Sequence, residues 1–290
     1  MSVGLASTAQ TGPAVPRPVA DELRQHVQHL FFETDLPSEG RNYVMRCLTS
    51  PPARTVQGRF GNAVHRVHSH KAGSVFLESR RGEYPAALLM DRTPEVVTFR
   101  AQPPTLDLLL KDEQGTVRTR VQYTADFLVV LRDGFCVREY RDEGSLVDRN
   151  FKNPFQFYTD SSHQWHYRAA EESVAEMWFR YEVHTYQSLP IRLIENARFL
   201  EDYASAECPP VDSRVAMRLR EIIQTRRYIS FLDLLDEGFT ADQIFRSVVD
   251  GLVDADLERQ RLDDTSRLTL FSDLATAEVY RLHELSKLGE

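Results

Sequence analysis

Three acidic residues follow one another in stretches that are otherwise largely apolar, and their order suits a divalent metal site. Glu83 precedes the run Ala86–Met90, Asp126 interrupts a run of Tyr, Phe, Leu and Val, and Glu139 comes two residues before Arg141. Oxygen-only ligands of this kind suit Mg²⁺ or Mn²⁺ rather than zinc. Such a metal polarises a phosphate and lowers the pKa of a bound water, while a neighbouring cation stabilises the developing charge. The pattern therefore indicates phosphodiester hydrolysis.

Glu83 is expected to stand where a helix begins. Ala86–Met90 supplies the apolar positions of that helix, and Pro85 suits its first turn because the N–H that proline lacks would have no partner there. A glutamate in this place can simply satisfy the helix dipole, which is the structural alternative. The two carboxylates further along the chain make metal binding the favoured interpretation.

Asp126 and Glu139 are expected to lie on the two strands of one β-hairpin. Apolar residues alternate over 121–131 and 135–141, and the Arg-Asp-Gly between these runs indicates a turn. Aspartate is uncommon inside strands. The predicted register places the two carboxylates side by side, which is unfavourable unless a cation neutralises them. The alternative is a solvent-facing edge with a cross-strand ion pair, worth less than ~1 kcal/mol.

An ordered set of residues around these carboxylates resembles the PD-(D/E)xK nuclease fold and, within it, the TnsA-like endonuclease subunit of heteromeric transposases. The similarity spans roughly residues 54–203. The main motifs are Glu83 with its following Leu-Leu-Met-Asp, Gln102-Pro103 after a Val-x-x-Phe strand, Tyr123-Thr-Ala-Asp126-Phe127, and Glu139-Tyr-Arg141. The flanking matches are Gly61-Asn62 to Ser69-His-Lys71, Phe76-Leu-Glu-Ser79, and Glu195 to Tyr203. Each motif is weak by itself, so the evidence lies in their order.

The resemblance implies a metal-dependent DNA endonuclease that cuts transposon ends during DNA transposition. Asp126, Glu139 and Glu83 would hold Mg²⁺ (or Mn²⁺), and Arg141 would stabilise negative charge. The substrate would be double-stranded DNA. The partners would be a DDE-type transposase subunit and further transposition proteins, in a bacterial cytoplasm.

Arg141 stands where this family usually has lysine, and Ala125 where it usually has proline. A guanidinium with a pKa above ~12 stays charged and is a poor proton acceptor. This keeps a second hypothesis open: a catalytically weak or inactive nuclease-fold subunit that binds DNA or assists assembly. A restriction-type nuclease acting alone is less favoured.

The charge of the chain is negative overall but unevenly distributed. The net charge is −8, yet residues 41–81 hold eight basic residues against one acid, Glu78, a local net charge of +7. This segment leads into Glu83, so a phosphate-attracting surface would adjoin the metal site. The alternative is a solvated basic loop. The predicted DNA-binding residues are Arg54, Arg59, Arg66, Lys71, Arg80 and Arg81.

Composition sets the broad class of the protein. With 290 residues, 42% of them hydrophobic and 27% charged, the chain fits one large globular domain plus a small one. No apolar run approaches the ~18 residues of a membrane span. The three cysteines are expected to be packing residues. The cluster His65, His68 and His70 is more plausibly structural than metal-binding, because no cysteine accompanies it.

The chain is expected to form an α/β fold: a restriction-endonuclease-like mixed sheet flanked by helices, followed by a winged-helix domain. The predicted parts are a flexible tail (1–20), a nuclease domain with a basic N-terminal extension (21–207), the winged helix (208–274) and a C-terminal helix (275–290). Within the nuclease domain, residues 142–163 are interpreted as an irregular insertion and 167–180 as helical, with a closing strand from Tyr181 and another helix from Pro190.

The winged helix is predicted from three helical segments and a hairpin that follow a Cys-Pro-Pro linker. Thr240 and Gln243 form a capping box at the third helix. Residues 230–264 contain ten acids and three arginines, a net charge of −7, so phosphates would repel this module. We therefore expect it to dock on a protein, and DNA affinity to reside in residues 41–81.

Overall fold

The computed structural model describes residues 21–53, 65–77, 82–204 and 208–288. The predicted flexible tail lies outside these ranges, as do the motif residues Gly61, Asn62 and Ser79. Four of the predicted DNA-binding residues also lie outside them: Arg54, Arg59, Arg80 and Arg81. Arg66 belongs to a described strand, but its side chain lies outside the described part.

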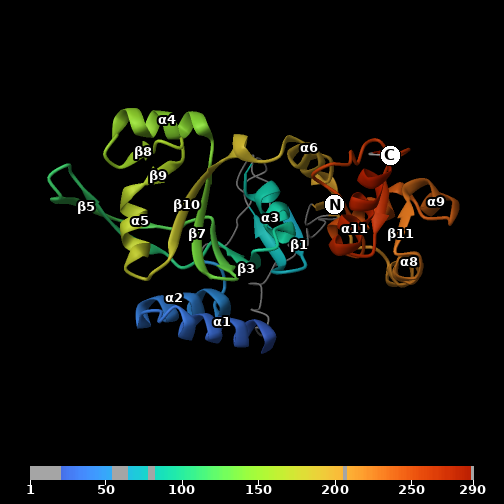
Figure 1. Cartoon of the computed structure of the whole chain (residues 1–290), viewed down its shortest axis with the longest axis horizontal. Helices are drawn as coiled ribbons and strands as arrows, with labels where there is room; N and C mark the ends of the chain where they lie inside the picture. Colours follow the sequence, from blue (N-terminus) through green and yellow to red (C-terminus); the bar gives the residue numbers. More distant parts are fainter. Residues whose placement is uncertain (1–20, 54–64, 78–81, 205–207, 289–290) are drawn as a thin grey trace, which may run out of the picture.

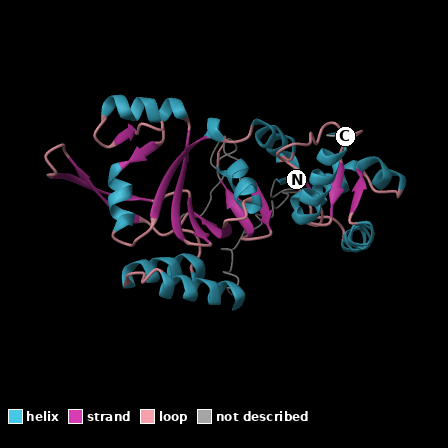
Figure 2. Ribbon diagram, in the orientation of Figure 1, coloured by secondary structure: helices cyan, strands magenta, loops and turns pink. Residues whose placement is uncertain are grey.

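A mixed sheet of six strands forms the centre of the molecule (Figures 1 and 2). Its strands, in spatial order, are β3 (Val96–Ala101), β6 (Phe127–Leu131), β7 (Gly134–Arg141), β10 (Arg180–Thr185), β9 (Trp165–Tyr167) and β8 (Phe157–Thr159). β7 and β10 are parallel, and all other neighbours are antiparallel. Helices flank the sheet, which confirms the expected α/β fold with a mixed sheet.

Strand β6 is buried on both faces of this sheet. Phe127, Val129 and Leu131 point into one hydrophobic core, whereas Leu128 and Val130 point into a second. A strand covered on both sides has a continuous apolar sequence, which explains the Phe-Leu-Val-Val-Leu run. The predicted turn after it is confirmed, because Leu131 pairs with Gly134 of β7.

The two cores are covered by different parts of the chain. Below the sheet in Figure 1 lie α1 (Asp21–Glu33) and α2 (Ser38–Thr49), which the sequence analysis treated only as a basic extension. They share the second core with α5 (Arg168–Ala175). The first core contains the hairpin β1 (His65–Ser69) and β2 (Gly73–Leu77), helix α3 (Glu83–Arg92) and the C-terminal segments.

Two segments between the motifs are more regular than expected. Residues 106–123 form the hairpin of β4 (Leu106–Lys111) and β5 (Val117–Tyr123). The single predicted strand 121–131 is therefore wrong: it is divided between β5 and β6. The interpretation of residues 142–163 as an irregular insertion is also wrong. They contain α4 (Glu143–Lys152), which is capped by Asp142, and strand β8.

Helix α5 is shorter than predicted. It ends at Ala175, short of the predicted residue 180, and Trp178 has a positive φ of 60° and is 58% exposed. The strand predicted from Tyr181 is confirmed as β10. Pro190 does precede a helix, which divides into α6 (Ile191–Phe199) and α7 (Glu201–Ala204), with the short helix η1 (Tyr186–Ser188) before it.

The residues after the proline linker form a small module of helices and a three-stranded sheet, ordered β11-β13-β12. Its elements are α8 (Ser213–Arg226), β11 (Tyr228–Ser230), α9 (Phe231–Asp236), α10 (Ala241–Val249), β12 (Asp254–Ala255), β13 (Thr269–Phe271) and α11 (Leu274–Leu288). The capping box of Thr240 and Gln243 is present at α10. Only five residues of the expected long hairpin are strand.

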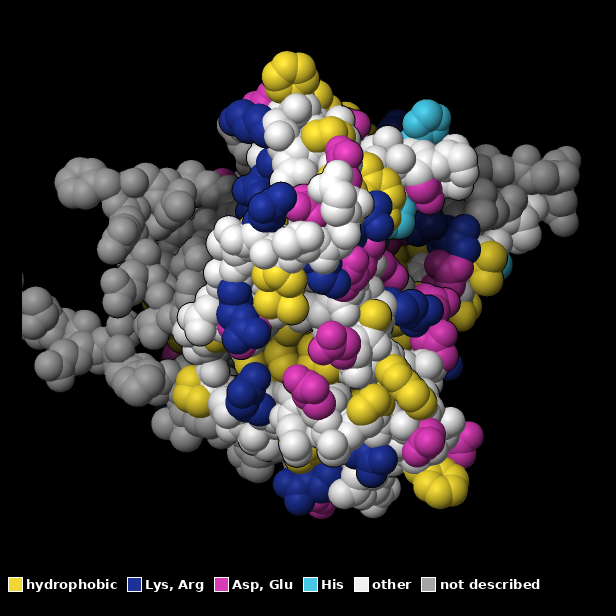
Figure 3. Space-filling view, turned by 90° about the vertical axis from the view of Figure 1, so that its left-hand side faces the viewer, with side chains coloured by type: hydrophobic (Ala, Val, Ile, Leu, Met, Phe, Trp, Pro, Cys, Tyr) yellow, Lys and Arg dark blue, Asp and Glu magenta, His cyan; other side chains and the backbone are white. Residues whose placement is uncertain are grey.

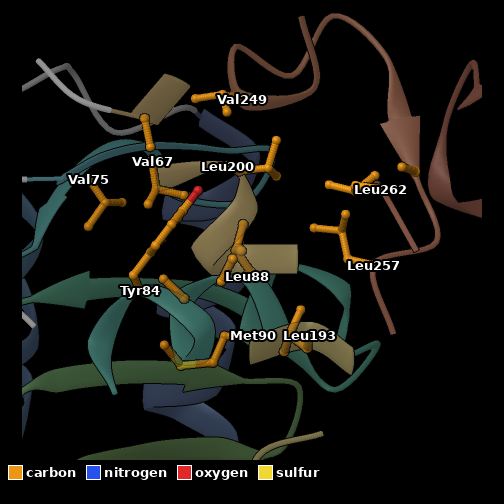
Figure 4. Packing of buried hydrophobic residues seen from close by; sticks show 14 of the residues in the cluster. Val67, Val75, Tyr84, Leu88, Met90, Leu193, Leu200, Val249, Leu257 and Leu262 are labelled. Atoms are coloured by element: carbon orange, nitrogen blue, oxygen red, sulfur yellow. The ribbon is translucent and has the colours of Figure 1, made fainter. Parts of the chain in front are cut away.

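This C-terminal module shares its hydrophobic core with the central sheet. One continuous cluster extends from β1, α3 and α6 to the module, and Figure 4 shows Leu88 of α3, Leu200, Leu257 and Leu262 packed in it. The Asn196 side chain of α6 adds polar contacts: it donates to the carbonyls of residues 257 and 260 (2.9 and 2.7 Å) and accepts from the N–H of residue 262 (3.0 Å). The predicted domain boundary is thus bridged by packing.

Helix α10, the third helix of the module, is largely covered by α6 and α7. The ring of Phe245 lies 4.7 Å from that of Phe199, and Tyr203 donates to Asp242 (3.0 Å). Arg246 is 4% exposed and donates to the carbonyl of Tyr203. Five of the nine residues of α10 are therefore buried.

In the described ranges of the chain, no helix has both the length and the apolar character needed to cross a membrane.

Candidate active site

Asp126 and Glu139 face each other at one end of the β6–β7 hairpin. Phe127 pairs with Arg138, and the next step of this antiparallel register places Asp126 opposite Glu139. Asp126 lies one residue before β6 rather than inside a strand, but the predicted juxtaposition is correct. Both side chains are buried, at 6% and 2% exposure. The solvent-facing edge that was the alternative is excluded for Glu139.

Glu139 is held by partners on both of its oxygens. The hydroxyl of Tyr123 donates to Oε2, and the guanidinium of Arg141 forms an ion pair with Oε1. The Tyr123 hydroxyl lies 3.1 Å from that of Tyr181 on β10. Tyr181 was not recognised from the sequence, because its place beside the site depends on the parallel pairing of β10 with β7.

Asp126 is fixed through backbone contacts. Its Oδ2 accepts a hydrogen bond from the N–H of Tyr140 (2.8 Å). Its carbonyl accepts from the N–H of Gln102 (2.9 Å), which directly follows β3. Gln102 is buried and has a φ of 52°, a left-handed conformation that is costly for a residue other than glycine. The motif residue Gln102 therefore lies beside Asp126, in a conformation often found at functional sites.

Glu83 is the first residue of α3 and is 8% exposed. The helix start is pressed against η1: a Cβ atom on Gly82 would lie 1.9 Å from Cε1 of Tyr186. Only glycine allows this approach. The close packing of Gly82 on Tyr186 therefore determines the position of the helix end that carries Glu83, the third carboxylate.

The three carboxylates act on one another electrostatically. Burial and the negative charge of Asp126 raise the pKa of Glu139 to about 8, with a further contribution from Glu83, although Arg141 and the Tyr123 hydroxyl oppose the rise. For Arg141, burial opposes the charged form, but Glu139, Tyr123 and Asp126 together outweigh it and raise the guanidinium pKa. A cation would stabilise this crowded arrangement.

The donor atoms fit a hard divalent cation, although they do not form a complete cage. Across the described ranges, no group of three or more His, Cys, Asp or Glu side chains is arranged to hold a metal ion. Mg²⁺ is commonly held by one or two carboxylates, with waters and substrate phosphates as its other ligands. The facing carboxylates of Asp126 and Glu139 could supply these two ligands. Glu83 is close enough to affect the pKa of Glu139.

The raised pKa of Glu139 predicts how stability changes with pH. Its pKa of about 8 lies above the ordinary 4.5, so between these values the folded chain binds a proton that the unfolded chain releases. The stability from this group is complete below pH 4.5 and is lost as the pH rises towards 8. Mg²⁺ favours the ionised form, so in thermal melts it should raise Tm more at pH 8 than at pH 6, by a few degrees at roughly 2–4 °C per kcal/mol.

The Glu139→Gln variant is the control for this pH dependence. It lacks the titrating group, so its metal-free stability should change less between pH 6 and 8. An equal Mg²⁺ effect at both pH values in the wild-type protein would contradict the assignment.

Lys71 is the one predicted DNA-binding residue whose side chain is described. Its ammonium donates to the carbonyls of Met90 and Thr93 at the end of α3 (3.2 and 2.5 Å), and burial lowers its pKa. In the histidine cluster, His70 pairs with the buried Asp254 of β12 at 3.3 Å. The side chains of Lys71 and His70 thus both make contacts within the protein.

A cavity of about 670 Å³ lies between α2, the β4–β5 hairpin and α5. None of the predicted site residues lines it. Its charged lining is mixed: Arg46, Lys111 and Arg120 against Glu39, Asp107, Glu172 and Glu176. On this side of the molecule, basic, acidic and apolar side chains are intermixed, and no patch of a single charge dominates (Figure 3). The cavity is therefore not part of the carboxylate site.

No protein-family model matches this chain, and no curated protein matches its sequence.

Proposed function

We propose that the protein is a metal-dependent DNA endonuclease, the TnsA-like subunit of a heteromeric transposase that cuts at transposon ends. The observation that carries the proposal is the facing pair of buried carboxylates, Asp126 and Glu139. Burying two like charges side by side is unfavourable. A catalytic cation is the simplest reason for a chain to retain them.

Asp126 and Glu139 would hold Mg²⁺ or Mn²⁺, with Glu83 as a third carboxylate. The bound metal would polarise the scissile phosphate and lower the pKa of an attacking water. Tyr123 orients the Glu139 carboxylate through its hydroxyl. Arg141, which pairs with the same carboxylate, contributes positive charge where negative charge develops.

The arrangement of elements supports the restriction-endonuclease-like assignment. Of the two facing carboxylates, Asp126 directly precedes β6 and Glu139 lies in the neighbouring β7. The third comes from a helix that packs on the same sheet. We further propose that the C-terminal module is a winged helix that docks on the DDE-type transposase. The coverage of α10 and the excess of acids support protein docking over reading of DNA.

The alternative is an assembly subunit that binds DNA but cleaves weakly or not at all. It is favoured by the ion pair between Arg141 and Glu139, because a guanidinium so paired is a poor proton acceptor.

The proposal is tested by incubating the full chain with supercoiled plasmid that carries the transposon ends. The reactions contain Mg²⁺ or Mn²⁺, with and without the transposase subunit. Metal-dependent nicking confined to the ends supports the endonuclease. End binding without nicking, in the presence of the transposase, supports the assembly subunit. Absence of both activities would overturn the proposal.

Replacing Arg141 separates the two candidates. Arg141→Lys is expected to maintain the nicking rate or raise it by up to about tenfold, because lysine can transfer a proton as well as stabilise charge. The rate is measured with Mg²⁺ between pH 7 and 9. The control is Arg138→Lys. Arg138 lies on the same strand as Arg141 but pairs with Glu182 of β10. A large loss in Arg141→Lys alone would show that the guanidinium has a role of its own.

A further inference from the structure

Helix α4 brings a second arginine to the carboxylate site. Arg149 lines a small cavity of about 10 Å³ together with Glu139, Arg141 and the tyrosines 123 and 181. Arg149 lies in the segment that was interpreted as an irregular insertion, and the sequence pattern did not indicate it. Its position follows from α4, which begins two residues after the end of β7 and packs against β8.

Arg149 is exposed and lies beside an aromatic ring. The central carbon of its guanidinium is 5.2 Å from the centroid of the Phe157 ring, a cation–π contact. In the described ranges, Arg149 has no carboxylate within ion-pair distance, whereas Arg141 is paired with Glu139. Of these two arginines, Arg149 is therefore the one with uncommitted charge.

The element that carries Arg149 is anchored at both ends. Asp142 caps the first turn of α4 by accepting from the N–H of Ser145. Near the other end, Asn150 donates to the carbonyl of Phe157 (2.6 Å). Leu146, between these contacts, is buried. A charge on an anchored helix is positioned more accurately than a charge on a loop.

We propose that Arg149 is a substrate-positioning residue that binds a backbone phosphate of the DNA strand entering the carboxylate site. This inference rests on the proposed function and names the group that would hold the substrate there. An arginine fork suits a phosphate, because two parallel N–H groups can donate to two of its oxygens. Arg141 would act at the reacting centre, and Arg149 would fix the neighbouring phosphate.

The test is DNA binding by fluorescence anisotropy, without metal, over a series of salt concentrations. The variants are Arg149→Gln and Arg149→Lys in the full chain, with labelled double-stranded DNA as the probe. Arg149→Gln should weaken binding about tenfold and reduce the slope of log K against log salt by about 0.9, the value for one phosphate contact. Arg149→Lys should retain that slope, because the charge remains.

Arg218→Gln is the matched control. Arg218 also lies 5.2 Å from an aromatic ring, that of Phe239, but it belongs to α8 and donates to Glu237. Its replacement should leave DNA affinity unchanged. In nicking assays, Arg149→Gln should raise KM more than it lowers kcat, as expected for lost substrate binding.

The outcomes separate the two proposals. If the wild-type chain binds DNA and Arg149→Gln has the same affinity and salt slope, the role of Arg149 is overturned and the proposed function remains. If the wild-type chain does not bind DNA even at low salt, both are overturned.

Discussion

Asp126→Ala is expected to abolish divalent metal binding and to reduce nicking by about a thousandfold or more, since it removes both a ligand and the charge that a cation neutralises. The change also leaves the N–H of Tyr140 without its acceptor, at a cost of about 1–3 kcal/mol. Removal of a charge that raises the pKa of Glu139 offsets part of this cost. Nicking is measured on supercoiled plasmid, and Mn²⁺ binding by calorimetry.

Asp91→Asn provides the comparison for Asp126→Ala. Asp91 is equally buried but lies at the far end of α3, where it accepts hydrogen bonds from Ser69 and from backbone N–H groups. Its replacement tests the loss of a buried carboxylate without loss of the proposed ligand. If Asp126→Ala retained metal binding and nicking, the site assignment would be wrong.

Asn196→Ala is expected to lower the free energy of unfolding by about 3 kcal/mol or more, because each orphaned buried group costs roughly 1–3 kcal/mol. The side chain satisfies three backbone groups of the C-terminal module. Urea unfolding of the full chain measures the change.

Asn150→Ala serves as the control for this loss of stability. Asn150 makes one comparable contact, to the carbonyl of Phe157, so its replacement should cost only about 1 kcal/mol. A similar small loss in Asn196→Ala would show that water replaces the missing contacts and that the polar interface contributes little.

The local parts of the site could be predicted from the sequence. The facing of Asp126 and Glu139 depends on one short turn and on alternation within neighbouring residues, so the pattern alone determines it. The start of α3 at Glu83 depends equally on nearby residues. The interruption between β5 and β6 has no proline or glycine to indicate it, and it was missed.

The remaining parts depend on contacts between distant segments. Tyr181 reaches the hydroxyl of Tyr123 beside Glu139 because β10 lies parallel to β7, and parallel pairing has no local signal. Arg149 was missed because α4 is amphipathic but short and flanked by polar residues. Helices α1 and α2 were not predicted, although Leu23, Val27 and Leu30 of α1 recur at helical spacing.

The shared core between the sheet and the C-terminal module has a mechanical consequence. The module is joined to the rest of the protein by the linker around Pro209 and Pro210 and by a packed interface. In this interface Asn196 of α6 makes hydrogen bonds to the loop after β12. A load applied to the module is therefore transmitted through this interface as well as through the linker. Since α6 also packs on α3, a protein that pulls on the module pulls on the helix that carries Glu83.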